Sequence, residues 1–153
     1  PADADADPAL IHNDYKYDNV VLDPEQLTRI TAVLDWEMAT IGSPAMDLGT
    51  TLGYWVDATD DARLQGFAFG PTNLPGSLTR AQLVERYEQR SGRAIARPVF
   101  YRAFGMFKIA VIIQQIFARY QRGSTQDPRF AALGYFVELL AEVGGEAASS
   151  GRV

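Results

Sequence analysis

The stretch LIHNDYKYDNVVL at residues 10–22, followed after a turn by AVLDWE at residues 32–37, decides the fold of this chain. Within it, β-branched runs at 20–22 and 30–34 are separated by Asp23-Pro24-Glu25, a sequence typical of tight turns. These runs predict a small antiparallel hairpin near the N-terminus of the chain.

Three oxygen-bearing side chains flank the predicted hairpin. Asp14 and Asn19 lie on the loop before it, and Asp35 ends its second strand. Because a hairpin brings its two outer ends together, we expect these side chains to converge. Carboxylate and amide oxygens suit Mg²⁺ completed by water and phosphate oxygens, and they suit zinc or copper poorly. Asp14 would then orient or deprotonate a hydroxyl group during phosphoryl transfer.

Four helices follow the hairpin, and the sequence marks their ends. Ser43-Pro44 supplies an N-cap and a first-turn proline, and Thr79 with Gln82 forms a capping box. Gly144-Gly145 is expected to close the last helix. These signals predict helices at about residues 44–56, 79–91, 98–122 and 128–143, with a core that includes Phe100, Phe104, Phe107 and Val111. The predicted fold class is therefore α+β and mainly α-helical.

Composition narrows the classes of function. With 153 residues, 47% of them hydrophobic and 22% charged, the chain is about one soluble domain long. It has no cysteine and one histidine, which excludes disulfides, Cys-ligated zinc, a thiol nucleophile and a multi-His metal site in one copy. A net charge of −5 argues against a nucleic acid or an anionic membrane as partner.

No segment is predicted to target or anchor the chain. Residues 1–8 alternate Ala with Asp and lack the basic start and apolar run of a signal peptide. The most apolar stretch, residues 99–118, is interrupted by polar side chains and is interpreted as a buried helix. We therefore expect a cytoplasmic location.

The loop before the hairpin carries a family resemblance. His12-Asn13-Asp14 followed by Asn19 resembles the H-x-D-x-x-x-x-N catalytic loop of protein kinases and of their relatives, the aminoglycoside and choline phosphotransferases. Asp35-Trp36-Glu37 and then Asp47-Leu48 follow in the order typical of aminoglycoside-phosphotransferase-like kinases. Among these, the sequence most resembles the branch that is fused to acyl-CoA dehydrogenases.

The resemblance implies a role for each matching residue. Asp14 would be the catalytic base or the carboxylate that orients the acceptor hydroxyl. Asn19 and Asp35 would bind the Mg²⁺ ions that bridge the phosphates of ATP. His12 and Asp47 would brace the catalytic loop and take no part in proton transfer.

Further residues carry a functional and a plainer interpretation. Lys16 is expected to contact the transferring phosphate, as the equivalent lysine does in protein kinases. Glu37 either supports the metal ligands or is a surface acid, and Tyr54 and Trp55 either line a substrate pocket or belong to the core. Asn13 stands where the family more often has Gly, and Asn tolerates the left-handed backbone conformation.

An acidic loop follows the first predicted helix. Asp57, Asp60 and Asp61 could face a cationic substrate, but solvent is the more ordinary environment for such a loop. We therefore expect these carboxylates to face water.

The resemblance also implies the organisation of the chain. Residues 9–145 would form a protein-kinase-like C-terminal lobe, between a flexible acidic lead-in at 1–8 and a disordered tail at 146–153. The sequence contains no G-x-G-x-x-G, no P-loop motif and no V-A-I-K-like strand. We therefore expect an N-terminal lobe of the same protein to complete the site, this chain alone to be inactive, and the uncovered lobe surface to be apolar and to self-associate.

The leading functional prediction is an ATP-dependent phosphotransferase that acts on a hydroxyl of a small molecule. Aminoglycoside-like, choline-like and hydroxyacyl acceptors all remain open, because fold analogy does not supply specificity. Two alternatives use the same residues differently: a non-catalytic kinase-like binding or regulatory module, and a metal-dependent phosphohydrolase.

Overall fold

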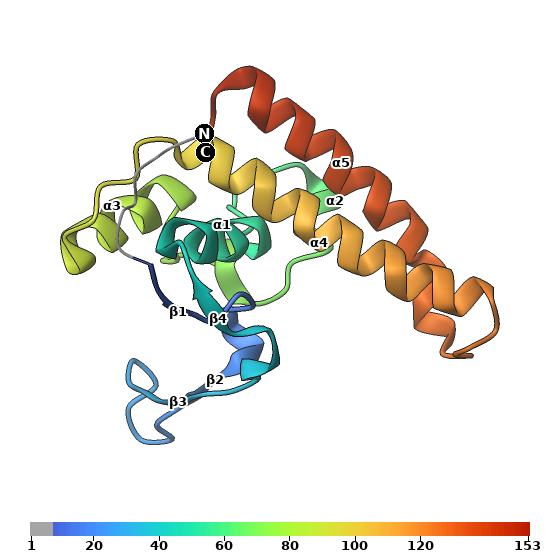
Figure 1. The fold of residues 1–153 in the computed structure, drawn as a ribbon, viewed down its shortest axis with the longest axis horizontal. Coiled ribbons are helices and arrows are strands. Elements are labelled where there is room, and N and C mark those ends of the chain that lie inside the picture. The colour runs from blue at the N-terminus through green and yellow to red at the C-terminus, as the bar shows by residue number, and fades with distance from the viewer. Residues whose placement is uncertain (1–7) are drawn as a thin grey trace.

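Two short β-ribbons lie at one side of a helical body (Figure 1). The structure is a computed structural model and describes residues 8–153. The lead-in predicted at residues 1–8, apart from the exposed Pro8, lies outside the described residues.

Both ribbons are antiparallel pairs. The predicted hairpin is present, with β2 (Val20–Leu22) paired to β3 (Ile30–Val33). In its turn, Asp23 Oδ1 accepts hydrogen bonds from the backbone N–H groups of the two residues after Pro24, at 2.9 and 3.1 Å. A second ribbon pairs β1 (Ala9–Ile11) with β4 (Thr40–Gly42). The sequence did not predict it, because three-residue strands are too short to show an alternating pattern.

Helix α1 (Pro44–Tyr54) runs through the middle of the molecule (Figure 1). It begins at the predicted residue and ends two residues earlier than expected. Ser43 occupies the N-cap position, but its buried hydroxyl forms no hydrogen bond within the described chain. Most of the helix is buried, which makes it the central element of the core; its buried residues are Ala45, Leu48, Gly49, Thr50, Thr51, Leu52, Gly53 and Tyr54.

Helix α4 (Pro98–Gln121) packs between α1 and α5 (Leu133–Ser150). At the crossing of α1 and α4 the two backbones touch, because a Cβ atom on Gly105 would lie 2.0 Å from the carbonyl oxygen of Gly49. By length and composition α4 could cross a membrane. In the structure α4 packs against helices on two sides, as expected for the buried helix that the sequence predicted.

The end of the last helix was predicted wrongly. Helix α5 continues through Gly144-Gly145 to Ser150, so most of the segment predicted as a disordered tail at 146–153 is helical. Ala147 is buried there, and a Cβ on Gly144 would lie in ordinary contact with Met106 of α4. Packing against α4 therefore overrides the poor helix propensity of the two glycines, and the helix ends at Gly151 in the left-handed conformation.

Helix α3 (Arg80–Ser91) follows its sequence signals closely. The backbone N–H of Gln82 donates to Thr79 Oγ1, and that of Thr79 donates to Gln82 Oε1, which is the predicted capping box. Gly92 closes the helix with a φ of 70°. The four-residue helix α2 (Ala62–Gln65), which lies in the loop before α3, was not predicted.

Several large apolar side chains are exposed. Phe100, Phe107 and Val111 of α4 are 42%, 65% and 40% exposed, which corrects their assignment to the core. Because α4 carries apolar residues on all sides, its sequence pattern does not indicate which side faces solvent. Leu10 and Ile41, which pair across the β1–β4 ribbon, are 63% and 66% exposed. Self-association through such a surface stays a prediction.

Candidate functional site

Asp47, in the first turn of α1, holds the backbone of the predicted catalytic loop. Its two carboxylate oxygens accept hydrogen bonds from the N–H groups of His12 (2.9 Å) and Asn13 (2.7 Å). Asn13 has a φ of 66°, the left-handed conformation that its residue type tolerates, and its Nδ2 donates to the carbonyl of Met38. These contacts are the ones expected of a residue that braces the loop.

The imidazole of His12 is buried and both of its nitrogens are engaged. Nε2 lies 2.7 Å from the carbonyl oxygen of Leu34 and so donates to it, while Nδ1 accepts from the backbone N–H of Asp14 at 3.2 Å. The ring also packs against Trp36, with centroids 4.8 Å apart. His12 therefore ties the catalytic loop to the end of the hairpin, and neither nitrogen is left to exchange a proton with a substrate.

Three donors surround the carboxylate of Asp14. The hydroxyl of Tyr54 donates to Oδ1 at 2.6 Å, and Nδ2 of Asn19 donates to Oδ2 at 2.9 Å. The ammonium group of Lys16 forms an ion pair with Oδ2. Because each donor comes from a different part of the loop or from α1, the orientation of the carboxylate is fixed.

These contacts also set the protonation state of Asp14. Burial raises the pKa of the carboxyl group, but the hydrogen bonds from Lys16, Tyr54 and Asn19 and the charge of Lys16 outweigh it, so the pKa lies below its ordinary value. Burial and the bond to Asp14 raise the pKa of Tyr54, which therefore stays a donor. At neutral pH the site presents an ionised carboxylate.

The predicted metal ligands lie at the ends of the hairpin. The N–H of Leu34 donates to the carbonyl of Asn19 at 2.8 Å, which brings the two segments side by side. Asp35 is exposed, has a left-handed φ of 62°, and forms no side-chain hydrogen bond within the described chain. Such a backbone conformation in a residue other than Gly is uncommon and is found most often at functional sites. Glu37 is exposed on the next turn, and no contact joins it to Asp14 or Asn19.

The donor set fits a hard divalent cation held by few protein atoms. Because Asn19 binds Asp14 through Nδ2, its Oδ1 is the atom that would be left for a metal, and the Asp35 carboxylate would be the second ligand group. Within residues 8–153 no group of three His, Asp or Glu side chains gathers to hold a metal. A Mg²⁺ ion there would complete its coordination with phosphate oxygens and water.

A pocket of about 230 Å³ opens beside Asp14. Lys16 and Tyr54, which hold the carboxylate, are also part of its wall. The wall is mostly apolar and aromatic and includes no acidic residue; its other members are Tyr15, Tyr17, Val20, Leu22, Ile30, Thr51, Trp55, Phe69, Thr72 and Leu83. Tyr54 is thus both a core residue and a pocket residue, while the half-buried Trp55 belongs to the pocket wall.

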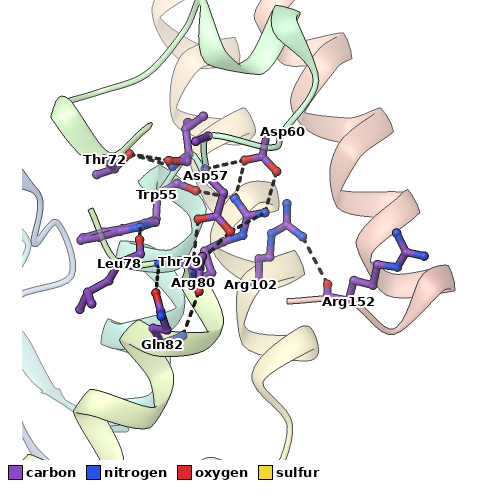
Figure 2. Close-up of polar contacts among 12 residues, drawn as sticks. Trp55, Asp57, Asp60, Thr72, Leu78, Thr79, Arg80, Gln82, Arg102 and Arg152 are labelled. Atoms are coloured by element: carbon purple, nitrogen blue, oxygen red, sulfur yellow. Dashed lines mark hydrogen bonds and ion pairs between the residues drawn. The ribbon is translucent and has the colours of Figure 1, made fainter. Parts of the chain in front are cut away.

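The position of Trp55 is fixed by a buried ionic cluster (Figure 2). Arg80 donates from Nη1 to the carbonyl of Trp55 at 2.9 Å and binds the carboxylate of Asp60 with both terminal nitrogens. The indole N–H of Trp55 donates to the carbonyl of Leu78 at 2.8 Å. The aromatic wall of the pocket is therefore held by an arginine 25 residues away in the sequence.

The same cluster corrects the prediction that the acidic loop faces water for Asp57 and Asp60, whereas Asp61 is exposed as predicted. Asp57 is buried, and its carboxylate accepts from the backbone N–H of Arg80 at 3.1 Å. Burial raises the pKa of Asp57 despite the charge of Arg80, whereas the bonds from Arg80 outweigh burial at Asp60 and lower its pKa. Arg102 is also buried, but within residues 8–153 it forms a single hydrogen bond, to the carbonyl of Arg152 at 3.3 Å, and burial lowers its pKa to about 10.

Lys108 is the contact to the catalytic loop that the sequence interpretation missed. It lies on α4, and its Nζ reaches the carbonyl oxygen of Asn13 at 2.6 Å. The signal that could have found it is a charged side chain, one of two within the largely apolar stretch 99–118. A charged residue in a buried helix needs polar partners, and the catalytic loop supplies them.

One face of α1 contacts the catalytic loop along its length. Asp47 binds the loop at its start, Thr51 donates to the carbonyl of Tyr15 at 2.9 Å, and Tyr54 binds Asp14. The spacing of four and then three residues places these side chains above one another on one face of a helix. Four loop residues are therefore positioned by a single rigid element.

Comparisons with known proteins agree with this geometry. A family model described as "Phosphotransferase enzyme family" matches residues 1–92. The curated relatives include "Acyl-CoA dehydrogenase family member 11" of Gallus gallus, which is 34% identical over 150 residues that cover 94% of this chain and 19% of the relative.

Two further relatives come from Mus musculus and Arabidopsis thaliana. "Acyl-CoA dehydrogenase family member 10" of Mus musculus is 30% identical over 136 residues, covering 88% of this chain and 12% of the relative. "Probable acyl-CoA dehydrogenase IBR3" of Arabidopsis thaliana is 30% identical over 119 residues, covering 75% and 14%. The chain therefore spans less than a fifth of the length of these relatives.

Proposed function

The chain belongs to the phosphotransferase enzyme family, as its catalytic loop predicted, and from this premise we propose that it takes part in transferring the γ-phosphoryl group of ATP to a hydroxyl of a small molecule. The helical body would serve as a protein-kinase-like C-terminal lobe. A nucleotide-binding lobe from elsewhere in the same protein would complete the site. The activity of the whole protein is part of this proposal, because the chain spans under a fifth of its relatives.

The observation that carries the proposal is the ionised carboxylate of Asp14, fixed by three donors at the edge of a pocket. An acceptor hydroxyl in the pocket would give its proton to Asp14 as its oxygen attacks the γ-phosphorus. The bond from that phosphorus to the bridging oxygen breaks, and ADP leaves. Lys16, which forms an ion pair with this carboxylate, would bind the transferring phosphoryl group.

Asn19 and Asp35 would hold Mg²⁺ against the phosphates. The ion supplies positive charge that offsets the negative charge of the triphosphate during transfer. The left-handed backbone of Asp35 and the unoccupied Oδ1 of Asn19 support this assignment.

The pocket favours some acceptor classes over others. Its wall contains no acidic residue, so a polycationic aminoglycoside would lack the carboxylates it needs. Apolar and aromatic side chains suit an acceptor with an apolar body, such as a hydroxyacyl group, or a single quaternary ammonium held by ring faces. We therefore place hydroxyacyl and choline-like acceptors ahead of aminoglycosides.

The test is phosphoryl transfer by the full encoded length of the protein, with Asp14→Asn beside Asp18→Asn. Asp18 lies on the same loop and is exposed, which makes it a matched control. Loss of a general base predicts a rate lower by roughly 10²–10⁴-fold for Asp14→Asn and an unchanged rate for Asp18→Asn.

Other outcomes identify the alternatives. Nucleotide binding without transfer to any hydroxyacyl, choline-like or aminoglycoside acceptor would indicate a binding or regulatory module. Phosphate release that needs no acceptor would indicate a phosphohydrolase. Either result would refute the proposed reaction.

A further inference from the structure

The chain uses lysine at only two positions, and both side chains end at the catalytic loop. Of its 14 basic residues, only Lys16 and Lys108 are lysines, and the rest are arginines. Lys16 binds the carboxylate of Asp14, and Lys108 reaches the loop from α4, 95 residues along the chain from Asn13. Lys108 has no role in the proposed reaction so far.

The ammonium group of Lys108 has an acceptor for each of its hydrogens. Nζ lies 2.6 Å from the carbonyl oxygen of Asn13, 3.3 Å from Asn13 Oδ1 and 3.3 Å from Thr50 Oγ1. A lysine ammonium has three donor hydrogens that radiate from one atom, and these acceptors surround one point. The planar fork of an arginine suits such an arrangement poorly.

The backbone contact between α1 and α4 delivers this ammonium. Gly105 touches Gly49, and Lys108 follows Gly105 by three residues, so it extends from the same side of α4. Thr50, next to Gly49, then lies within reach of Nζ. Burial lowers the pKa of Lys108, and the nearby charges of Asp14 and Asp47 oppose that shift.

We propose that Lys108 is a positioning residue of the phosphotransfer site, which holds Asn13 in its left-handed conformation and thereby orients Asp14. A residue other than Gly in this conformation needs support from its surroundings. Asp47 supplies it at the N–H of Asn13, and Lys108 supplies it at the carbonyl and the side chain. The kinetic part of this inference rests on the proposed function, but its structural part does not.

The structural part is tested on this chain by NMR with uniform ¹³C and ¹⁵N labelling, which reports both the lysine side chains and the backbone amides. Two side-chain signals are expected, and Lys108→Met assigns them. Loss of the Lys108 contacts predicts that the Lys16 signal and the amides of Asn13 and Asp14 shift, while the amides of α3 do not. Gln115→Met, an exposed site on the same helix, is the control and should shift none of them.

Two further variants keep the test decisive. If Lys108→Met does not fold, Lys108→Gln replaces it, because glutamine retains a donor but not the charge. Lys108→Arg should restore the loop signals only in part. Unchanged Lys16 and Asn13 signals in every folded variant would overturn the inference.

The kinetic part uses the full encoded length of the protein. A displaced base predicts that Lys108→Met lowers kcat by roughly 10- to 100-fold. The KM for ATP should change by less than about threefold, because Lys108 contacts neither of the two residues predicted to hold the Mg²⁺ of the nucleotide. An unchanged kcat would contradict the inference.

The two parts separate the two proposals. Suppose that Lys108→Met shifts the loop signals but the unsubstituted full-length protein transfers no phosphoryl group. That result would support the role of Lys108 in positioning the loop and refute the proposed reaction. Transfer that persists in Lys108→Met with unchanged loop signals would support the reaction and overturn the role of Lys108.

Discussion

Replacing Arg80 by Met should destabilise the protein far more than the same replacement at Arg102. Both arginines are buried and belong to the same cluster (Figure 2). Arg80 binds the carboxylate of Asp60 with two nitrogens, lies 3.5 Å from the carboxylate of Asp57, and donates to the carbonyl of Trp55. Among the residues that the structure describes, Arg102 forms one hydrogen bond, at 3.3 Å, and no ion pair.

The contacts give the expected magnitudes. Removing one partner of a buried ion pair leaves the other charge uncompensated, which costs about 3–5 kcal/mol. Arg80→Met leaves two such carboxylates, with Arg102 as their nearest cation, so we expect the upper part of that range. Replacing a poorly paired buried charge by an apolar side chain of similar shape is often neutral or stabilising, so Arg102→Met should change the free energy of unfolding by less than about 1 kcal/mol.

Urea unfolding at pH 7, monitored by circular dichroism, measures both effects. For a chain of this size the loss predicted for Arg80→Met corresponds to a melting temperature lower by roughly 6–20 °C. The fluorescence of Trp55, whose carbonyl Arg80 binds, should also change in Arg80→Met and not in Arg102→Met.

Equal losses in the two variants would refute this reasoning. So would a loss below about 1 kcal/mol for Arg80→Met, because it would mean that Asp57 and Asp60 do not need the buried cation.

Two further predictions concern the crossing of α1 and α4 and the loss of stability at acidic pH. Gly105→Ala should lower the free energy of unfolding in urea by about 1–3 kcal/mol or more, because its Cβ would meet the Gly49 carbonyl. Gly145→Ala has open space around it and should raise that free energy by up to about 1 kcal/mol. Equal effects of the two substitutions would contradict the backbone contact. Because the folded pKa of Asp60 is lowered below the unfolded value of about 3.9, its contribution is fully present above that value and is lost as the pH falls through the folded pKa. The gap between wild type and Asp60→Asn should therefore be wide at pH 7 and close at lower pH, and a gap that does not depend on pH would exclude this linkage.

Local signals predicted much of the fold. The hairpin and the capping box at Thr79 depend on residues within a few positions of one another. The end of α5 depends on its packing against α4, where Ala147 is buried, and the two helices lie far apart in sequence. Local helix propensity therefore gave the wrong end.

The site divides in the same way. Asp14, Asn19, Asp35 and Asp47 could be identified because they lie in one ordered motif within 34 residues. Tyr54 was recognised only as a residue with two interpretations, and its bond to Asp14 depends on how α1 is oriented against the loop.

The partners missed by the sequence interpretation come from distant elements. Arg80 binds Asp60 across 20 residues, and Lys108 binds Asn13 across 95. Neither pair leaves a local pattern, because the two members come together only when the helices pack. A charged side chain in an apolar helix was the one available hint, and it indicates that a partner exists without naming it.

Because one face of α1 holds the catalytic loop, the contacts to the loop depend on how the residues of this helix are rotated about its axis. Inserting or deleting one residue between Asp47 and Tyr54 would rotate the second contact by about 100° relative to the first. Asp47 would still bind the loop backbone, but Tyr54 would point away from Asp14. Length variation should therefore be tolerated better in the segment between Asp60 and α3, which contributes Phe69 and Thr72 to the pocket wall, than within these two turns of α1. On the proposed function, the orientation of Asp14 would depend on a helix of fixed length, while part of the pocket wall would be free to vary.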